Sequence, residues 1–448
     1  MTKPVNEELG RGGAVARRRV TPNAHLAANA GHSFDDGTRR TEILQTAASL
    51  IATSGLRTSL QEIADAAGIL PGSLYHHFES KEAILVELLR RYHDDLDRIA
   101  DQALNRLDDP TSLSAFDRIV ELGAAIAQCA VTHSAALQMT FYEAPTSNPE
   151  LAALAQQRPA AIHEAMVQTL RAARWSGYLR PDVDLPILAD RIVQAMRQVG
   201  LDVIRHSAGA DKVAATLCRI LLEGLATVPP SDAELDRSAA FIAADDAVKS
   251  WIEDERNAPN DKASHVRAVA RAEFGRKGYE VTTIRNIASA AGLGTGTVYR
   301  LIGSKEELLA SIMQSFGEKV AEVGWTSVLR SDASAIEKLD GLSWIHTNAL
   351  AHFGDEFRIQ LAWMRQSPPD TPNIAWLFTK RVRQMKALLT AGIRSGEISI
   401  EGPSNETIAR VVIGVSWIPE NLLHDLGPRA SQIHVRDTLL RGVTTRSA

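Results

Sequence analysis

Residues Ser59–Lys81, with the sequence SLQEIADAAGILPGSLYHHFESK, predict two short helices joined by a tight turn. Apolar residues at helical spacing around Ile63 give the first helix one buried face. Thr58 or Ser59 can cap this helix by accepting a hydrogen bond from its first turn. Gly68 ends it, because the chain needs a left-handed residue at that point.

The second helix begins at Pro71, whose missing N–H is tolerated in a first turn. Leu74 and Phe78, four residues apart, point to the same core. The opposite face carries the polar residues Ser73, Tyr75, His76 and His77. A helix pair with its polar face on the second helix is typical of the helix-turn-helix, which inserts that helix into the major groove. The alternative is a surface helical hairpin without a ligand.

The same pattern occurs a second time, in residues Thr283–Lys305, TIRNIASAAGLGTGTVYRLIGSK. The two copies align without a gap from the second helix onward, so that Gly68 corresponds to Gly292 and Tyr75 to Tyr299. A repeat separated by more than 200 residues indicates duplicated domains rather than a solenoid.

The runs Glu62–Gly68, Gly72–Tyr75 and Ser80–Glu82 resemble the N-terminal domain of the TetR family of bacterial repressors. The resemblance covers about 45 residues, from about Thr38 to Glu82. It implies an all-α fold with two tandem units, each a three-helix helix-turn-helix DNA-binding domain plus a helical ligand-binding and dimerisation domain.

Apolar periodicity, prolines and glycines divide the chain into six predicted segments. They are a disordered basic arm (1–35), a first helix-turn-helix domain (36–82), a first helical regulatory domain (83–228), a linker with a bridging helix (229–260), a second helix-turn-helix domain (261–306) and a second helical regulatory domain (307–448).

Composition is that of an ordinary globular protein, with 45% apolar and 23% charged residues over 448 positions. No apolar run approaches the length of a membrane span. Two distant cysteines, Cys129 and Cys218, fit a reducing cytoplasm. A net charge of −5 argues against indiscriminate coating of nucleic acid but allows a local basic face. Nucleophile-elbow, zinc-protease and Walker A motifs are absent, so we expect no enzyme, cofactor or metal.

The resemblance implies a set of DNA-binding residues in each copy. In the first copy they are Ser59, Gln61, Pro71, Gly72, Ser73, Tyr75, His76, His77 and Lys81. In the second copy they are Thr283, Thr295, Gly296, Thr297, Tyr299, Arg300 and Lys305. Two departures from the family pattern stand out. Leu70 and Gly294 occupy a position where the family often has a capping serine, and His77-Phe78 becomes Leu301-Ile302.

The regulatory domains contain aromatic and sulfur-containing residues that are candidates for a ligand pocket, although such residues are usually core. In the first half they are His133, Met139, Phe141, Tyr142, Met166 and Trp175. In the second half they are Trp344, Phe357, Trp363 and Met364. The resemblance favours a small-molecule effector, either acyl-CoA-like or another hydrophobic ligand.

These observations predict a cytoplasmic, sequence-specific transcriptional regulator, a repressor that a small-molecule effector releases from double-stranded DNA. Two DNA-binding domains must lie roughly 34–36 Å apart to reach successive major grooves. The last two helices of each half are expected to pair, either within one chain as a pseudo-dimer or between like halves of a homodimer. The alternative is a ligand-binding or scaffold protein whose second helix-turn-helix no longer binds DNA.

Overall fold

A computed structural model describes residues 32–107, 113–140, 148–206, 209–257, 259–365, 372–402 and 404–445. The secondary structure of these ranges is helical, and they contain no strand. Two isolated β-bridges are present. The predicted all-α class is therefore confirmed. None of the helices in these ranges is long and apolar enough to cross a membrane. Residues Met1–Thr41 and Glu42–Ala448 form separate units, and the description below concerns the second. The predicted basic arm falls outside the described residues up to position 31.

The first half runs from α1 to α10, with α5 packed against α8, α9 and α10. Its elements are α1 (His32–Ser54), η1 (Gly55–Arg57), α2 (Leu60–Ala66), α3 (Pro71–His77), α4 (Lys81–Leu107), α5 (Ala115–Thr132), α6 (Ser134–Met139), α7 (Pro149–Gln156), α8 (Ala160–Trp175), α9 (Leu185–His206) and α10 (Ala210–Glu223). In α4, Leu85, Leu89, Tyr92 and Leu96 recur at helical spacing and are buried, which holds this long helix against α8.

The second half repeats this order of elements. They are α13 (Lys262–Lys277), α14 (Ile284–Ala290), α15 (Thr295–Ile302), α16 (Lys305–Gly317), η2 (Glu318–Trp325), α17 (Thr326–Arg330), α18 (Ala335–His352), α19 (Gly354–Arg365), α20 (Pro372–Ser395), α21 (Asn405–Val415), α22 (Glu420–Val435) and η3 (Arg436–Arg441). Ser114 caps α5 as Ser334 caps α18, and positive-φ glycines follow both α8 (Gly177) and α20 (Gly396). These landmarks mark equivalent positions in the two regulatory domains, and the spacing between cap and glycine differs by one residue.

Residues 229–260 depart from the prediction of a linker with a bridging helix. They form α11 (Asp232–Asp236) and α12 (Ala239–Arg256), and α12 packs along α17 and α18 of the second half. Trp251 is buried, and its ring meets that of Phe353 edge-on at 5.2 Å. The stretch therefore belongs to the core of the second regulatory domain, because its apolar face finds a partner there.

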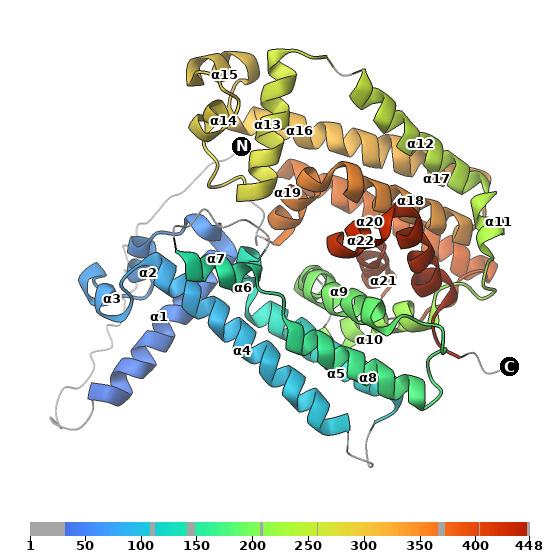
Figure 1. Cartoon of the computed structure of the whole chain (residues 1–448), viewed down its shortest axis with the longest axis horizontal. Helices are drawn as coiled ribbons and strands as arrows, with labels where there is room; N and C mark the ends of the chain where they lie inside the picture. The colour runs from blue at the N-terminus through green and yellow to red at the C-terminus, as the bar shows by residue number, and fades with distance from the viewer. Residues whose placement is uncertain are drawn as a thin grey trace, which may run out of the picture. The chain divides into compact units, whose positions relative to one another are not determined.

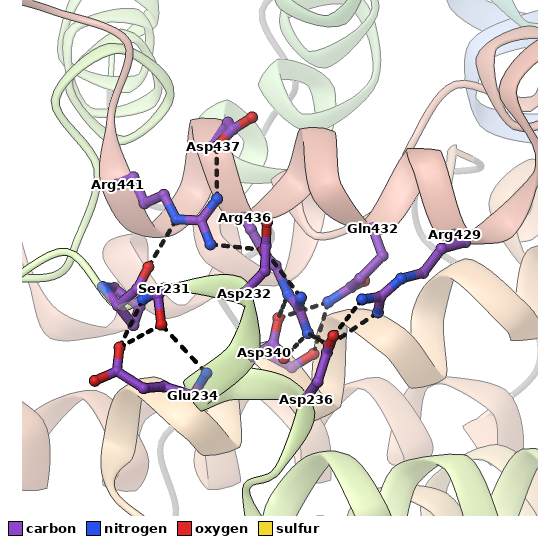
Figure 2. A network of polar contacts seen from close by, with 11 residues as sticks. Ser231, Asp232, Glu234, Asp236, Asp340, Arg429, Gln432, Arg436, Asp437 and Arg441 are labelled. Atoms are coloured by element: carbon purple, nitrogen blue, oxygen red, sulfur yellow. Dashed lines mark hydrogen bonds and ion pairs between the residues drawn. The ribbon is translucent and has the colours of Figure 1, made fainter.

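A network of ion pairs fixes α11 to the same domain (Figure 2). Arg436 is fully buried and donates from Nε and Nη2 to both carboxylate oxygens of Asp340, at 2.8 and 2.9 Å. It also donates to Asp232 and Asp236 on α11, while Gln432 donates to Asp340 at 2.7 Å. Burying these charges is tolerable only because each one is paired and hydrogen-bonded.

The two halves meet through the helices that were predicted to pair (Figure 1). Helix α21 packs against both α9 and α10, and η3 packs against α10. Helix α22 is broken at Gly427, which has φ of +76° and precedes Pro428. Arg191 in α9 is buried and donates to the carbonyl oxygen of Val415 in the other half at 2.7 Å. Asn421 donates to Asp190 at 2.8 Å.

Corresponding segments of the halves pair reciprocally. Leu179, just after α8, forms an antiparallel bridge with Thr444, and Ile398, just after α20, forms one with Ala226. Counted from the shared glycines, Leu179 corresponds to Ile398 and Ala226 to Thr444. Each half thus offers the same two segments to the other, which is the pattern of a two-fold interface.

Two glycines, Gly224 and Gly442, lie at a close contact between the halves. Both have φ of +76° and end α10 and η3. A Cβ on Gly224 would lie 2.6 Å from the Leu440 carbonyl oxygen, and one on Gly442 would overlap the Glu223 carbonyl. Both positions therefore need glycine, for the backbone conformation and for the close approach.

Candidate nucleic-acid interface

The first helix-turn-helix is built as the sequence predicts. Ser59, rather than Thr58, is the N-cap of α2: its side chain accepts from the Glu62 N–H, and Glu62 accepts from the Ser59 N–H at 2.6 Å. These hydrogen bonds hold the pKa of Glu62 below its usual range. Thr58 is buried instead and donates to Gly55. Leu74 and Phe78 are buried below α3, which leaves the other face to solvent.

The second helix-turn-helix has the same local geometry. Thr283 forms the equivalent capping box with Asn286. Gly68 and Gly292 share φ of +65°, and the following N–H groups of Ile69 and Leu293 bond back across the turn at 3.0 and 2.9 Å. Both copies therefore hold the second helix in place through the same turn, although only part of their sequence is shared.

The predicted DNA-contacting side chains lie mostly on the exposed face. Tyr75 and Tyr299 are 55% and 56% exposed, at equivalent positions of α3 and α15. The exposed predicted residues of the first copy are Ser59, Gln61, Gly72, Ser73, Tyr75 and His76, and those of the second are Thr283, Thr295, Gly296, Tyr299 and Arg300. Pro71, His77 and Thr297 are half-buried. The face offers hydroxyl, imidazole and guanidinium donors to phosphates and base edges.

The two lysines at the starts of α4 and α16 have a structural contact that the sequence did not reveal. Lys81 donates to the Leu56 carbonyl oxygen, and Lys305 donates to the equivalent Glu280 carbonyl at 3.4 Å. Lys305 also lies over the Tyr279 ring, 4.1 Å from its centroid. Burial lowers the pKa of Lys81. Each ammonium group ties the fourth helix to the loop that precedes the helix-turn-helix.

The predicted departures from the family pattern are visible in both copies. Leu70 and Gly294 occupy the N-cap positions of α3 and α15, and neither makes a side-chain cap. Where Phe78 is buried in the first copy, Ile302 is half-buried in the second. Val298 keeps the core contact of α15, so the second domain retains its fold.

Each DNA-binding domain is attached to its regulatory domain through equivalent short helices. Gln138 in α6 donates to the Ala52 carbonyl oxygen at 3.3 Å. On the other half, α19 packs along α13, where Glu356 pairs with Arg271 at 3.4 Å. Burial raises the pKa of Glu356. A movement of α6 or α19 would therefore move the attached DNA-binding domain.

The ligand candidates of the first half do not converge on a cavity. Met139 and Met166 are core residues, and His133 bonds Asp95 at 2.7 Å. Trp175 is not enclosed by the domain: its side chain is 80% exposed, because it lies in the last turn of α8 before the glycine turn. Phe141 and Tyr142 lie outside the described residues.

In the second half, Trp344 and Phe357 are used in packing. Trp344 donates to Asp245 at 3.2 Å, and Phe357 stacks on Trp417 with ring centroids 3.9 Å apart. The side chains of Trp363 and Met364 lie outside the described part of the structure.

Cavities lined by described residues occur elsewhere. A groove of about 950 Å³ separates α7, α8 and α9 from α13, α19 and α22, and a smaller cavity of about 240 Å³ lies between α4, α5 and α8. Among the described residues, no predicted ligand residue lines either one. The rim of the groove holds charges that are already paired, such as Arg358 with Glu420. No cluster of metal ligands is found among the described residues.

Comparison with known proteins agrees with this geometry. The pattern of the family described as "Bacterial regulatory proteins, tetR family" matches twice, at residues 43–88 and 266–312. The chain is 35% identical over 200 residues to the HTH-type transcriptional repressor KstR2 of Rhodococcus jostii RHA1, covering 42% of this chain and 92% of that repressor. It is 27% identical over 194 residues to the regulator UidR of Escherichia coli K12, covering 42% and 93%.

Among solved structures, one titled "Structure of ketosteroid transcriptional regulator KstR2 of Mycobacterium tuberculosis" has 28% sequence identity, with a TM-score of 0.33. It covers 39% of this chain and 89% of that chain. Two matched DNA-binding units, and a relative that is covered over most of its length, show that this chain belongs to the TetR family of bacterial transcriptional regulators.

Proposed function

We propose that this protein is a repressor in which one chain provides the two DNA-binding domains that a TetR-type dimer normally provides with two chains. The observation that carries the proposal is the reciprocal pairing of the halves, in which Leu179 bridges Thr444 and Ala226 bridges Ile398. An interface of this kind presents two DNA-binding domains related by a pseudo-two-fold axis. Tethering supports it, because the second half is always present at high effective concentration.

The DNA-binding domains are proposed to contact unequal half-sites. His76 and Arg300 occupy equivalent exposed positions on α3 and α15. Arginine can bond guanine by two parallel hydrogen bonds, and histidine cannot form that fork. The operator is therefore proposed to be an imperfect palindrome. The capping box, the turn glycine and the exposed Tyr299 of the second domain support its retention of DNA binding over the scaffold alternative.

The effector is proposed to be a small molecule that binds better when the DNA-binding domains are out of register with the operator. The M. tuberculosis relative KstR2 is described as a ketosteroid transcriptional regulator. This description supports a largely apolar effector for this chain. An acyl-CoA-like ligand belongs to the same class of proposals.

A gel-shift with DNA from upstream of the protein's own gene tests the proposal, and light scattering on the complex gives the number of chains per operator. We expect one chain of 48.6 kDa on one operator. Two chains per operator would contradict the one-chain arrangement. A failure to bind DNA with an intact fold would favour the scaffold alternative.

A further inference from the structure

The core of the second regulatory domain contains a buried arginine that has no counter-charge among the described residues. Arg381 in α20 is 1% exposed, and among the described residues its Nε and Nη2 have no hydrogen-bond partner. Burial alone lowers its pKa, to about 10, so the guanidinium stays charged at neutral pH. Burying an unpaired charge is costly, and native proteins rarely keep one without a function.

The unpartnered atoms have the geometry of an anion site. Nε and Nη2 lie on one edge of the guanidinium, the edge that binds a carboxylate by two parallel hydrogen bonds. The Arg381 charge also acts on His346 of α18, which is fully buried and whose lowered pKa, about 3, keeps the ring neutral. His346 lies on α18 and Arg381 on α20, and these two helices pack against each other in the core.

His346 adds a donor to the same region. The Trp325 Nε1–H donates to His346 Nε2 at 3.1 Å, so Nε2 is the acceptor and the proton of the neutral ring is on Nδ1. This Nδ1 has no partner among the described residues. On one side the His346 ring stacks on Trp417, with centroids 4.5 Å apart. The region thus combines charged and neutral N–H donors with flat apolar walls.

The first half has apolar residues at the positions equivalent to these polar groups. Counting from the shared caps, His346 and Thr347 correspond to Ile126 and Ala127. Counting from the shared glycines, Arg381 and Gln384 correspond to Ile162 and Ala165. All four first-half residues are fully buried aliphatic side chains. In the second half, Thr347 Oγ1 and Gln384 Oε1 are also unpartnered within the described ranges. The same fold packs as an apolar core without these groups, so they are not required for folding.

We propose that the second regulatory domain binds one small carboxylate with an apolar body, held by Arg381 and His346, and that the first domain has no equivalent site. That this carboxylate is the effector rests on the function proposed above. The carboxylate would accept from the guanidinium edge and from His346 Nδ1–H. Its apolar body would contact the aromatic side chains around them.

A continuous set of contacts leads from this site to the second DNA-binding domain. His346 stacks on Trp417, and Trp417 stacks on Phe357 of α19. The first turn of α19 lies against α13, where a Cβ on Gly275 would come within 2.7 Å of Asp355. A ligand that shifts the aromatic stack would therefore shift α19 and, with it, the domain that carries Arg300.

Thermal unfolding of the full chain in chloride-free buffer tests the site without DNA. The probes are benzoate, phenylacetate and hexanoate at millimolar concentration, each with its neutral amide as control. We expect at least one acid to raise the Tm by about 2 °C or more and the amides to leave it unchanged. Arg381→Met should abolish the rise. Arg383→Met, at an exposed position of the same helix, should retain it.

Three outcomes would overturn the proposal: no rise with any acid, an equal rise in Arg381→Met, or an equal Arg381-dependent rise with chloride alone. Calorimetric titration should give one site per chain, and two sites would refute the difference between the halves. The ligand-free Arg381→Met variant should be as stable as the parent or more so, because an unpaired buried charge is removed. A loss of Tm as large as that of Arg436→Met would show that Arg381 is paired within the protein.

The carboxylate site and the repressor function are tested separately. Binding of an acid through Arg381 without a gel shift of DNA would support the site and contradict the repressor function. A chain that binds its operator but no acid would refute the site alone.

Discussion

At the scale of the residue, Arg300 is the side chain that most distinguishes the two DNA-binding domains. It lies exposed on α15, next to Tyr299, at the position that His76 occupies on α3. The turns that precede the two helices have the same backbone geometry, since both domains share the positive-φ glycine and the capping box. The different side chains on the helices are therefore expected to give the two domains different sequence preferences.

Arg300→Ala should reduce discrimination at one half-site by about 1–3 kcal/mol, because the bidentate contact to guanine is lost. Competition binding with operators altered in one half at a time measures this effect. His76→Ala is the matched control and should affect the other half-site. A perfectly symmetric consensus, or an Arg300→Ala variant with unaltered preference, would contradict the assignment.

Lys81 has two proposed roles that one variant can separate. Lys81→Met keeps the apolar stem and removes the ammonium group that donates to Leu56. We expect lower thermal stability, and a salt dependence of DNA binding whose slope falls by about one if a phosphate contact is also lost. An unchanged slope with lowered stability would assign Lys81 to the fold alone.

At the scale of the element, the ends of α10 and η3 decide how closely the halves approach. Gly442 needs both a positive φ and the absence of a Cβ. Gly442→Ala should cost at least about 2 kcal/mol, from backbone strain and overlap with Glu223. Gly396→Ala is the control: it shares the positive φ but has open space around it, so it should cost about 1–2 kcal/mol. Equal costs in denaturant unfolding would mean that the close approach is not made.

The buried ion pair between η3 and α18 supplies a second test at this scale. Arg436→Met leaves the buried Asp340 carboxylate without its counter-charge and should cost about 3–5 kcal/mol. Arg429→Met removes an exposed arginine that also contacts Asp236, and should cost about 0–1 kcal/mol. Urea unfolding of both variants measures the difference. A mild effect of Arg436→Met would show that the network of Figure 2 does not hold α11 in place.

At the scale of the whole molecule, the duplication places both partners of the interface in one chain. Leu217 and Leu221 of α10 are completely buried within this chain, where α10 contacts α21 and η3. The two partners have different sequences, so each half is free to change its DNA contacts or its ligand site independently.

Sedimentation at micromolar concentration should therefore find mainly a species near 48.6 kDa. A stable species of twice that mass, dissociated by a charge at Leu217 or Leu221, would show that like halves of two chains pair. A monomer that still protects both half-sites of an operator would exclude that arrangement.

The sequence alone determined the elements whose causes are local. These causes act within a few residues. They include capping residues such as Ser59, the left-handed turn at Gly68 and the apolar spacing around Ile63. The second helix-turn-helix shows the same three features. The same local signals located the helices of the regulatory domains. The kind of protein was predicted from the resemblance of one short stretch to the TetR family, because a helix-turn-helix motif is contained within it.

Features that depend on distant segments became apparent only in the folded chain. It packed α12 onto α18 where the sequence predicted a linker, exposed Trp175, and attached Lys81 to Leu56. It also paired Leu179 with Thr444 and left Arg381 without a counter-charge in the part of the chain that the structure describes. The physical reason is common to these cases: burial and pairing depend on what lies opposite a side chain, and residues hundreds of positions apart supply it. Periodicity shows which face of a helix is apolar, but it does not show which partner covers that face.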